Sequence, residues 1–200
     1  STNLYKELRR AALNPVYRHQ KTMGVREVLA MADETQPNGK VFRKLTLADQ
    51  YTWSTYEALL TRIDHFSNGL LAIGLRSGQN VVLFAETRPE WLVSAFACFR
   101  VQAPIVTLYA TLGVDALAYG INQTTAQYVF TSGEQLAKVH KIIGQIKQIT
   151  HVIVFDDRFS QKSLSDFRAS CASSSSGVKV FTLSEVEQLG KSTPTIQDYT

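Results

Sequence analysis

Two adjacent carboxylates, Asp156 and Asp157, are the first residues of this sequence that suggest chemistry. They directly follow an apolar run over residues 151–155. Paired carboxylates at the end of a buried strand can hold Mg²⁺, because hard cations prefer oxygen ligands. Tyr109 and Thr131 end the preceding apolar runs and add no further carboxylate. We therefore interpret the acidic pair as a solvated turn.

The patterns that mark phosphate-binding loops and hydrolytic sites are missing from the sequence. Gly69 and Gly74 have the spacing of a P-loop, but Leu75 and Arg76 follow where Lys and Ser or Thr are required. No G-x-G-x-x-G, G-x-S-x-G or H-E-x-x-H pattern occurs. The four histidines are far apart in the sequence and suggest no metal site: His19, His65, His140 and His151. Spacing alone predicts no catalytic, cofactor-binding or metal-ligating residue.

Composition and charge limit the class of protein. The chain has 200 residues, of which 44% are hydrophobic, enough to bury one core. The net charge of +4 is spread along the chain, and no basic patch with interleaved aromatics indicates nucleic-acid binding. Cys98 and Cys171 fit neither a disulfide framework nor a zinc spacing, so we expect one buried and one exposed thiol in a reducing compartment. The most apolar stretch, 91–99, is too short to span a bilayer.

The first part of the chain predicts helices and a hairpin. We expect short helices over residues 4–12 and 25–32, then a turn at Asn38 and Gly39, which tolerate positive φ. Residues 41–47 alternate as a strand does, and residues 51–53 are the expected hairpin partner. Ser54 and Glu57 form a capping box that opens a helix with apolar positions up to residue 70, and Gly74 is the expected C-cap.

From residue 81 onward, apolar runs of strand length alternate with helical patterns. We expect strands at 81–85, 105–108, 127–131, 151–155 and 178–181. The helices between them begin at Thr87 with Glu90 and Pro89, at residue 114, at Ser132 as an N-cap, and at Ser184 with Glu187. Because parallel strands are covered on both faces, this pattern predicts an α/β fold: a doubly wound, mostly parallel sheet preceded by an N-terminal hairpin and helix.

The expected organisation is an N-terminal segment over residues 1–40 and one incomplete domain over residues 41–200. Within that domain, residues from about 160 to 177 include four consecutive serines at 173–176. This composition predicts a flexible surface loop.

Three segments resemble a known family. They are Q-P-N-G-K-V-F at 36–42, E-T-R-P-E-W at 86–91 and V-T-L-Y-A-T-L-G at 106–113. Together with W-S-T-Y at 53–56 and G-L-L-A-I-G-L at 69–75, they resemble the N-terminal part of the long-chain fatty-acyl-CoA synthetases, within the adenylate-forming (AMP-binding) superfamily. The order and spacing agree from about residue 24 to about residue 190. Residues 22–29 and 36–42 are most similar to the branch that contains the type 3 and type 4 animal enzymes.

The resemblance implies an ATP-dependent long-chain fatty acid–CoA ligase. In this reaction a fatty acid carboxylate attacks the α-phosphate of ATP to give an acyl-adenylate and diphosphate, and CoA then displaces AMP. The implied cofactors are ATP, CoA and Mg²⁺, which neutralises the phosphates. The implied location is the cytosolic face of the endoplasmic reticulum or other organelle membranes, reached through a segment outside this chain. The resemblance leaves the oligomeric state open.

The family's catalytic motifs lie after the region matched here, and residues 192–200 resemble the stretch just before its phosphate loop. We therefore expect an N-terminal fragment that is inactive alone, and no catalytic residue can be assigned. Tyr109 and Thr111 follow a strand and are candidates for substrate contact, although a role in a turn is favoured. Lys138 is a candidate phosphate contact for the CoA nucleotide. Two alternatives stay open: a non-catalytic α/β binding or regulatory module, and an adenylate-forming enzyme with another acid substrate.

Overall fold

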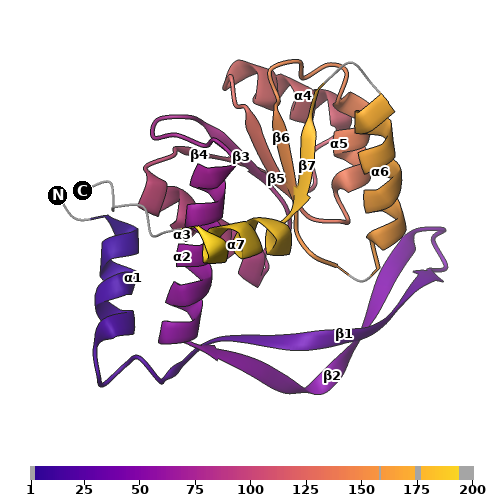
Figure 1. Cartoon of the computed structure of the whole chain (residues 1–200). Helices are drawn as coiled ribbons and strands as arrows, with labels where there is room; N and C mark the ends of the chain where they lie inside the picture. Colours follow the sequence, from indigo (N-terminus) through magenta and orange to yellow (C-terminus); the bar gives the residue numbers. More distant parts are fainter. Residues whose placement is uncertain (1–2, 158, 174–176, 194–200) are drawn as a thin grey trace.

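The computed structural model describes residues 3–157, 159–173 and 177–193. Its centre is a sheet of five parallel strands in the order β4-β3-β5-β6-β7 (Figure 1). The strands are β3 (Val81–Phe84), β4 (Ile105–Leu108), β5 (Tyr128–Thr131), β6 (His151–Val154) and β7 (Lys179–Thr182). The chain enters at β3, adds β4 on one side, and then returns to the other side for β5, β6 and β7. The direction of strand addition therefore reverses between β3 and β5.

Helices cover both faces of the sheet, which confirms the predicted doubly wound fold. One face packs against α2 (Tyr56–Ala72), α3 (Pro89–Val101) and α7 (Leu183–Ser192). The other face packs against α4 (Val114–Gln123), α5 (Leu136–Ile142) and α6 (Gln161–Ser173). Successive strand residues enter opposite cores, as Leu83 and Phe84 do. This burial on both faces explains why the strands read as continuous apolar runs.

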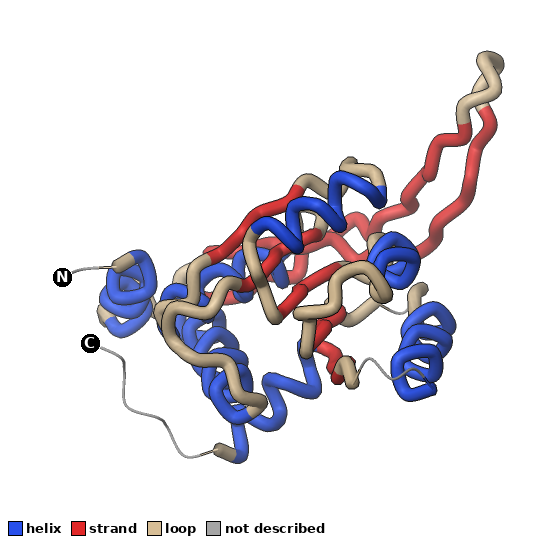
Figure 2. The backbone as a smooth tube through the Cα atoms, turned by 90° about the horizontal axis from the view of Figure 1, so that it is seen from above, coloured by secondary structure: helices blue, strands red, loops and turns tan. Residues whose placement is uncertain are grey.

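A helix and a long hairpin precede the sheet, as predicted. Helix α1 (Leu4–Leu13) packs on α2 and α3, and the Tyr5 hydroxyl donates a 2.8 Å hydrogen bond to Asp64. Strands β1 (Lys21–Thr35) and β2 (Val41–Thr55) form an antiparallel ribbon whose far end projects from the body of the molecule (Figure 2). No helix in the described ranges has both the length and the apolar character needed to cross a membrane.

The predicted helix over residues 25–32 is wrong, because this segment lies within β1. Residues 41–47 and 51–53 belong to the same strand, β2, and pair with β1 instead of with each other. The register shifts between Arg26 and Val28 and between Val28 and Ala30, and such irregularities break the alternation that identifies a strand. Pairing along the whole ribbon overrides the helical propensity of Leu29, Ala30 and Met31.

The predicted flexible loop over about 160–177 is also wrong for most of its length. Helix α6 occupies Gln161–Ser173 and buries Leu164, Phe167 and Cys171 along one side. The remainder of the serine run, at 174–176, lies outside the described residues, as do residues 194–200 of the C-terminal stretch.

Three helix starts differ from the predicted ones by one or two residues. Thr55, and not Ser54, caps α2, with its hydroxyl accepting from the Ala58 N–H. The residue before α3 is Arg88, which makes no side-chain cap, although Pro89 is the first helical residue as predicted. Thr182 and Glu185 form the capping box of α7 in place of Ser184 and Glu187. In each case the better-placed side chain captures the free N–H groups.

Two further features of the core matter below. Both cysteines are buried, so the expectation of an exposed thiol at Cys171 is wrong. Helices α2 and α7 cross at Gly69 and Gly190, where a Cβ on Gly190 would lie 1.7 Å from the carbonyl oxygen of His65. Only glycine permits so close an approach of two helix backbones.

Candidate functional site

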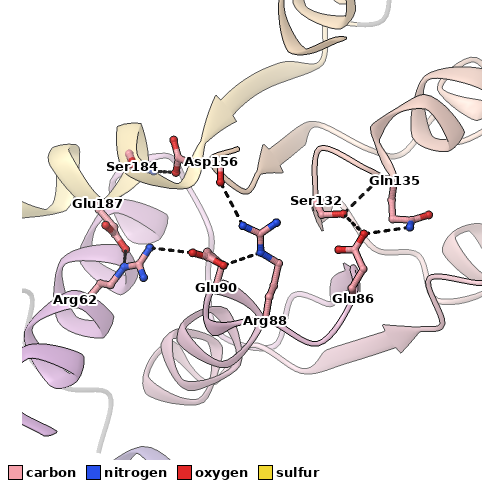
Figure 3. A network of polar contacts seen from close by, with 9 residues as sticks. All are labelled: Arg62, Glu86, Arg88, Glu90, Ser132, Gln135, Asp156, Ser184 and Glu187. Carbon is pink, nitrogen blue, oxygen red and sulfur yellow. Dashed lines mark hydrogen bonds and ion pairs between the residues drawn. The ribbon is translucent and has the colours of Figure 1, made fainter. Parts of the chain in front are cut away.

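The carboxyl ends of the parallel strands meet at one edge of the sheet. In open α/β sheets, ligands bind at this edge where the strand order reverses, which here is between β3 and β5. The loop after β3 carries Glu86, and the loop after β5 carries Ser132 and Gln135. Figure 3 shows these three side chains pointing toward one another. The point of reversal is therefore occupied by polar groups of the chain itself.

Glu86 is the acceptor at the centre of this cluster. Its Oε1 accepts hydrogen bonds from Ser132 Oγ at 2.9 Å and from Gln135 Nε2 at 3.2 Å (Figure 3). Burial alone would raise the pKa of Glu86, but the hydrogen bonds from Ser132, the Glu86 backbone, Gln135 and Glu134 together lower that pKa below 4.5. Glu86 is therefore ionised at neutral pH.

Glu134 is the second carboxyl group of the cluster and behaves in the opposite way. Burial, the negative charge of Glu86, the hydrogen bond that Glu134 donates to Glu86, and Asp157 all raise the pKa of Glu134, while Arg43 lowers it. Arg43 reaches Glu134 from the ribbon, with 3.7 Å between Nη1 and Oε1. The two carboxyl groups thus share a proton as the pH falls, and the charge of Arg43 limits the effect.

A second network joins the same edge to the helices of one face. Arg88 donates to Glu90 at 2.7 Å and to the backbone oxygen of Asp156 at 3.3 Å. Arg62 pairs with Glu187 at 2.7 Å and with Glu90 at 3.8 Å (Figure 3). Burial raises the pKa of Glu187, although Arg62 opposes the shift. The network connects α2, α3 and α7 with the end of β6.

Two adjoining cavities lie between the ribbon and this edge. The larger, of about 590 Å³, is lined by Val25, Met31 and Leu45 of the ribbon and by Glu86 and Arg88 of the edge, among others. The smaller, of about 360 Å³, is lined by Arg43, Gly133 and Ser160, among others. Both cavities contain Glu134, so the Arg43–Glu134 contact stands at their boundary. The space could accept a ligand that carries both apolar and polar groups.

The acidic pair after β6 serves the backbone. The Asp156 carboxylate accepts from the Ser184 N–H at 2.9 Å, and that of Asp157 accepts from the Phe159 N–H at 2.9 Å. Both residues hold turns, in agreement with their interpretation as a turn and not as a metal site. Across the part of the chain that the structure describes, no cluster of three or more His, Cys, Asp or Glu side chains is arranged to hold a metal ion. The acidic residues of this edge therefore do not fit Mg²⁺, and we derive no step through it.

The structure brings the three candidate contact residues to one turn after β4. Tyr109 is 81% exposed, and Thr111 is exposed two residues later. Lys138 donates from Nζ to the carbonyl oxygen of Ala110 at 2.6 Å, and its Nζ lies 5.6 Å from the centre of the Phe84 ring. Lys138 therefore stabilises this turn. Its contact with a phosphate stays a prediction, as do substrate contacts of Tyr109 and Thr111.

Sequence reasoning missed the pairing of Glu86 with Ser132. Ser132 is not the N-cap of α5, since that helix begins at Leu136 after Gln135. The two partners are 46 positions apart. The available signal was that both residues directly follow apolar strands, but the order of those strands had to be known before the residues could be paired.

The fold and this edge define a class first: a doubly wound α/β domain with an antiparallel ribbon beside the carboxyl ends of its strands. The chain belongs to the AMP-binding enzyme family, whose profile matches residues 31–200. It is 31% identical over 175 residues to long chain acyl-CoA synthetase 8 of Arabidopsis thaliana, covering 88% of this chain and 24% of the plant protein. It is 29% identical over 178 residues to fatty acyl-CoA synthetase A of Dictyostelium discoideum, covering 87% and 25%. The chain thus spans about a quarter of the length of these relatives.

Solved structures share the fold. The adenylation domain of a carboxylate reductase from Mycobacterium chelonae superposes with a TM-score of 0.82 at 18% identity, covering 100% of this chain and 31% of that one. The A domain of a carboxylic acid reductase from Segniliparus rugosus, in complex with AMP and a co-purified carboxylic acid, gives a TM-score of 0.79 at 18% identity, covering 98% and 31%. At such identities the likeness shows the architecture, which is that of the N-terminal domain of adenylate-forming enzymes.

Proposed function

We propose that these residues form the first part of an ATP-dependent long-chain fatty acid–CoA ligase, which converts a fatty acid, ATP and CoA into acyl-CoA, AMP and diphosphate through an acyl-adenylate. One observation carries the proposal: 88% of the chain aligns at 31% identity with a protein named long chain acyl-CoA synthetase. A carboxylic acid substrate is further supported by the related fold that was solved with AMP and a carboxylic acid.

Within that enzyme, the described residues position other parts and do not react. The Glu86 carboxylate is already bound by Ser132 and Gln135, and the Asp156 carboxylate by the Ser184 backbone. These contacts fix the loops at the carboxyl edge of the sheet. ATP, CoA and Mg²⁺ would be held mainly by residues other than these.

The finer expectations belong to the same proposal. The Q-P-N-G-K-V-F segment at 36–42 supports the branch of the type 3 and type 4 animal enzymes. We assign the enzyme to the cytosolic face of the endoplasmic reticulum or of another organelle membrane, by the same resemblance.

The acid specificity is tested by ATP–diphosphate exchange. The transcript that encodes these residues is read in full and its product is assayed with palmitate, butyrate and benzoate in turn. Exchange that depends on palmitate supports the proposal. Exchange with benzoate or butyrate alone would keep the adenylate-forming chemistry and reject the long-chain substrate. The 200-residue chain serves as the matched control, with no exchange expected.

A further inference from the structure

Most of the positive charge of this chain lies near its N-terminal end. The first 26 residues hold six of the 21 Lys and Arg residues but one of the 17 acidic residues, Glu7. The other 174 residues hold 15 basic and 16 acidic side chains. This count corrects the expectation that the charge excess is spread along the chain.

Large apolar side chains are exposed in the same region. Leu13, Val16 and Tyr17, at the end of α1 and just after it, are 56%, 67% and 48% exposed. Tyr51 and Trp53, near the end of β2, are 54% and 46% exposed. Isolated exposed apolar residues are ordinary, but a group of this size together with cations indicates an interaction surface.

Backbone contacts bring these two groups to one corner of the molecule. The Tyr56 N–H donates to the carbonyl oxygen of Gln20 at 3.3 Å, and Lys21 pairs with Thr55 across the ribbon. Lys21 Nζ lies 5.7 Å from the centre of the Trp53 ring, and Arg26 Cζ lies 6.0 Å from that of Tyr51. Figure 1 shows the connection between α1 and β1 meeting the near end of the ribbon at the lower left. We call this surface the basic corner; its residues are Arg9, Leu13, Val16, Tyr17, Lys21, Arg26, Tyr51 and Trp53.

We infer that the basic corner binds an anionic lipid surface. Tyr and Trp side chains favour the boundary between headgroups and acyl chains, and Lys and Arg are attracted to anionic headgroups. A groove on a protein partner fits less well, since such grooves take the apolar face of a helix, and α1 already buries Tyr5 and Ala12 of that face against α2 and α3. The inference does not depend on the proposed ligase reaction, because it rests on exposure and charge.

Vesicle binding tests the inference. The 200-residue chain is sedimented with vesicles of phosphatidylcholine alone or with 30% phosphatidylserine, and tryptophan emission is recorded. We expect binding to the anionic vesicles, a blue shift that is lost in Trp53→Phe, and release as salt is raised, because surface charges are screened. Arg9→Gln with Lys21→Gln should weaken binding about 30-fold. Val16→Ser with Tyr17→Ser should weaken it about tenfold or more.

Matched controls lie elsewhere on the molecule. Lys141→Gln with Lys147→Gln removes two exposed cations, and Tyr119→Ser removes a side chain that is 70% exposed. Each control should bind as the parent chain does, and thermal melts verify that all variants are folded. Equal binding to both kinds of vesicle would overturn the inference. Losses that are the same in control and corner variants, or binding to anionic vesicles that is unchanged in both corner variants, would also overturn it.

Discussion

Ser132 Oγ donates a 2.9 Å hydrogen bond to Glu86 Oε1, and this contact joins the loops after β3 and β5 where the strand order reverses. Many open α/β sheets bind a ligand at that place. Here the carboxylate of the chain itself receives the hydrogen bonds. The contact makes the edge a rigid support for the cavities beneath the ribbon.

Loss of the Ser132 hydroxyl should therefore destabilise the fold. Ser132→Ala removes a hydrogen bond to a charged, partly buried acceptor, and we expect the free energy of unfolding to fall by about 1–2 kcal/mol. Urea denaturation measures the change. Ser165→Ala, at an exposed position of α6, is the control and should stay within about 0.5 kcal/mol of the parent chain. Equal effects of the two substitutions would show that the Glu86 contact contributes nothing.

The sequence predicts the sheet well and this contact poorly, for one physical reason. Strands such as β3 and β6 are buried on both faces, so their apolar runs are local signals. Helix α6 also left a local signal, the spacing of Leu164, Phe167 and Cys171, but the surrounding serines obscured it. The ribbon strand β1 depends on pairing with β2, and the Glu86–Ser132 bond depends on strand order. Both are long-range relationships that no local pattern contains.

The stability of the fold should decrease in mild acid because of His151. This ring is stacked on Tyr128, with 4.7 Å between ring centres, and its Nε2 is buried without a hydrogen-bond partner among the described residues. Burial and the nearby Lys179 lower the pKa of His151 below 6.5. As the pH falls below 6.5, the unfolded chain therefore takes up a proton before the folded chain does, and the free energy of unfolding decreases.

His151→Phe tests this expectation, because it keeps an aromatic ring and removes the titration. The stability of the variant relative to the parent chain should increase as the pH is lowered from 7 to 5, measured by urea denaturation at each pH. His19→Gln, at an exposed residue, should lack this trend. A relative stability of His151→Phe that does not change with pH would contradict the account.

The crossing of α2 and α7 should reject any side chain at Gly190. Alanine is favoured over glycine in a helix by about 1 kcal/mol. At Gly190, however, the added Cβ would lie 1.7 Å from the carbonyl oxygen of His65, which is backbone and cannot turn aside. We expect Gly190→Ala to lower the free energy of unfolding by about 2 kcal/mol or more. At Gly144 a Cβ would meet nothing within 4 Å, so Gly144→Ala should be close to neutral.

Both thiols should be unreactive in the folded chain. Burial raises the pKa of Cys98 to about 12, and burial also raises that of Cys171. Since the thiolate is the reactive form, alkylation by iodoacetamide at pH 8 should label neither residue until urea unfolds the chain. Mass spectrometry of the labelled peptides reads the result. Rapid labelling of Cys171 below the unfolding transition would show that α6 opens locally.

The most direct test of the central claim is the formation of the thioester. The product of the complete transcript that encodes these residues is incubated with palmitate, ATP, Mg²⁺ and CoA, and palmitoyl-CoA and AMP are measured by mass spectrometry. We predict palmitoyl-CoA and AMP in equal amounts, and only acyl-adenylate when CoA is left out. If neither palmitoyl-CoA nor the adenylate forms while the protein is folded, the assignment to the long-chain fatty acid–CoA ligases is wrong.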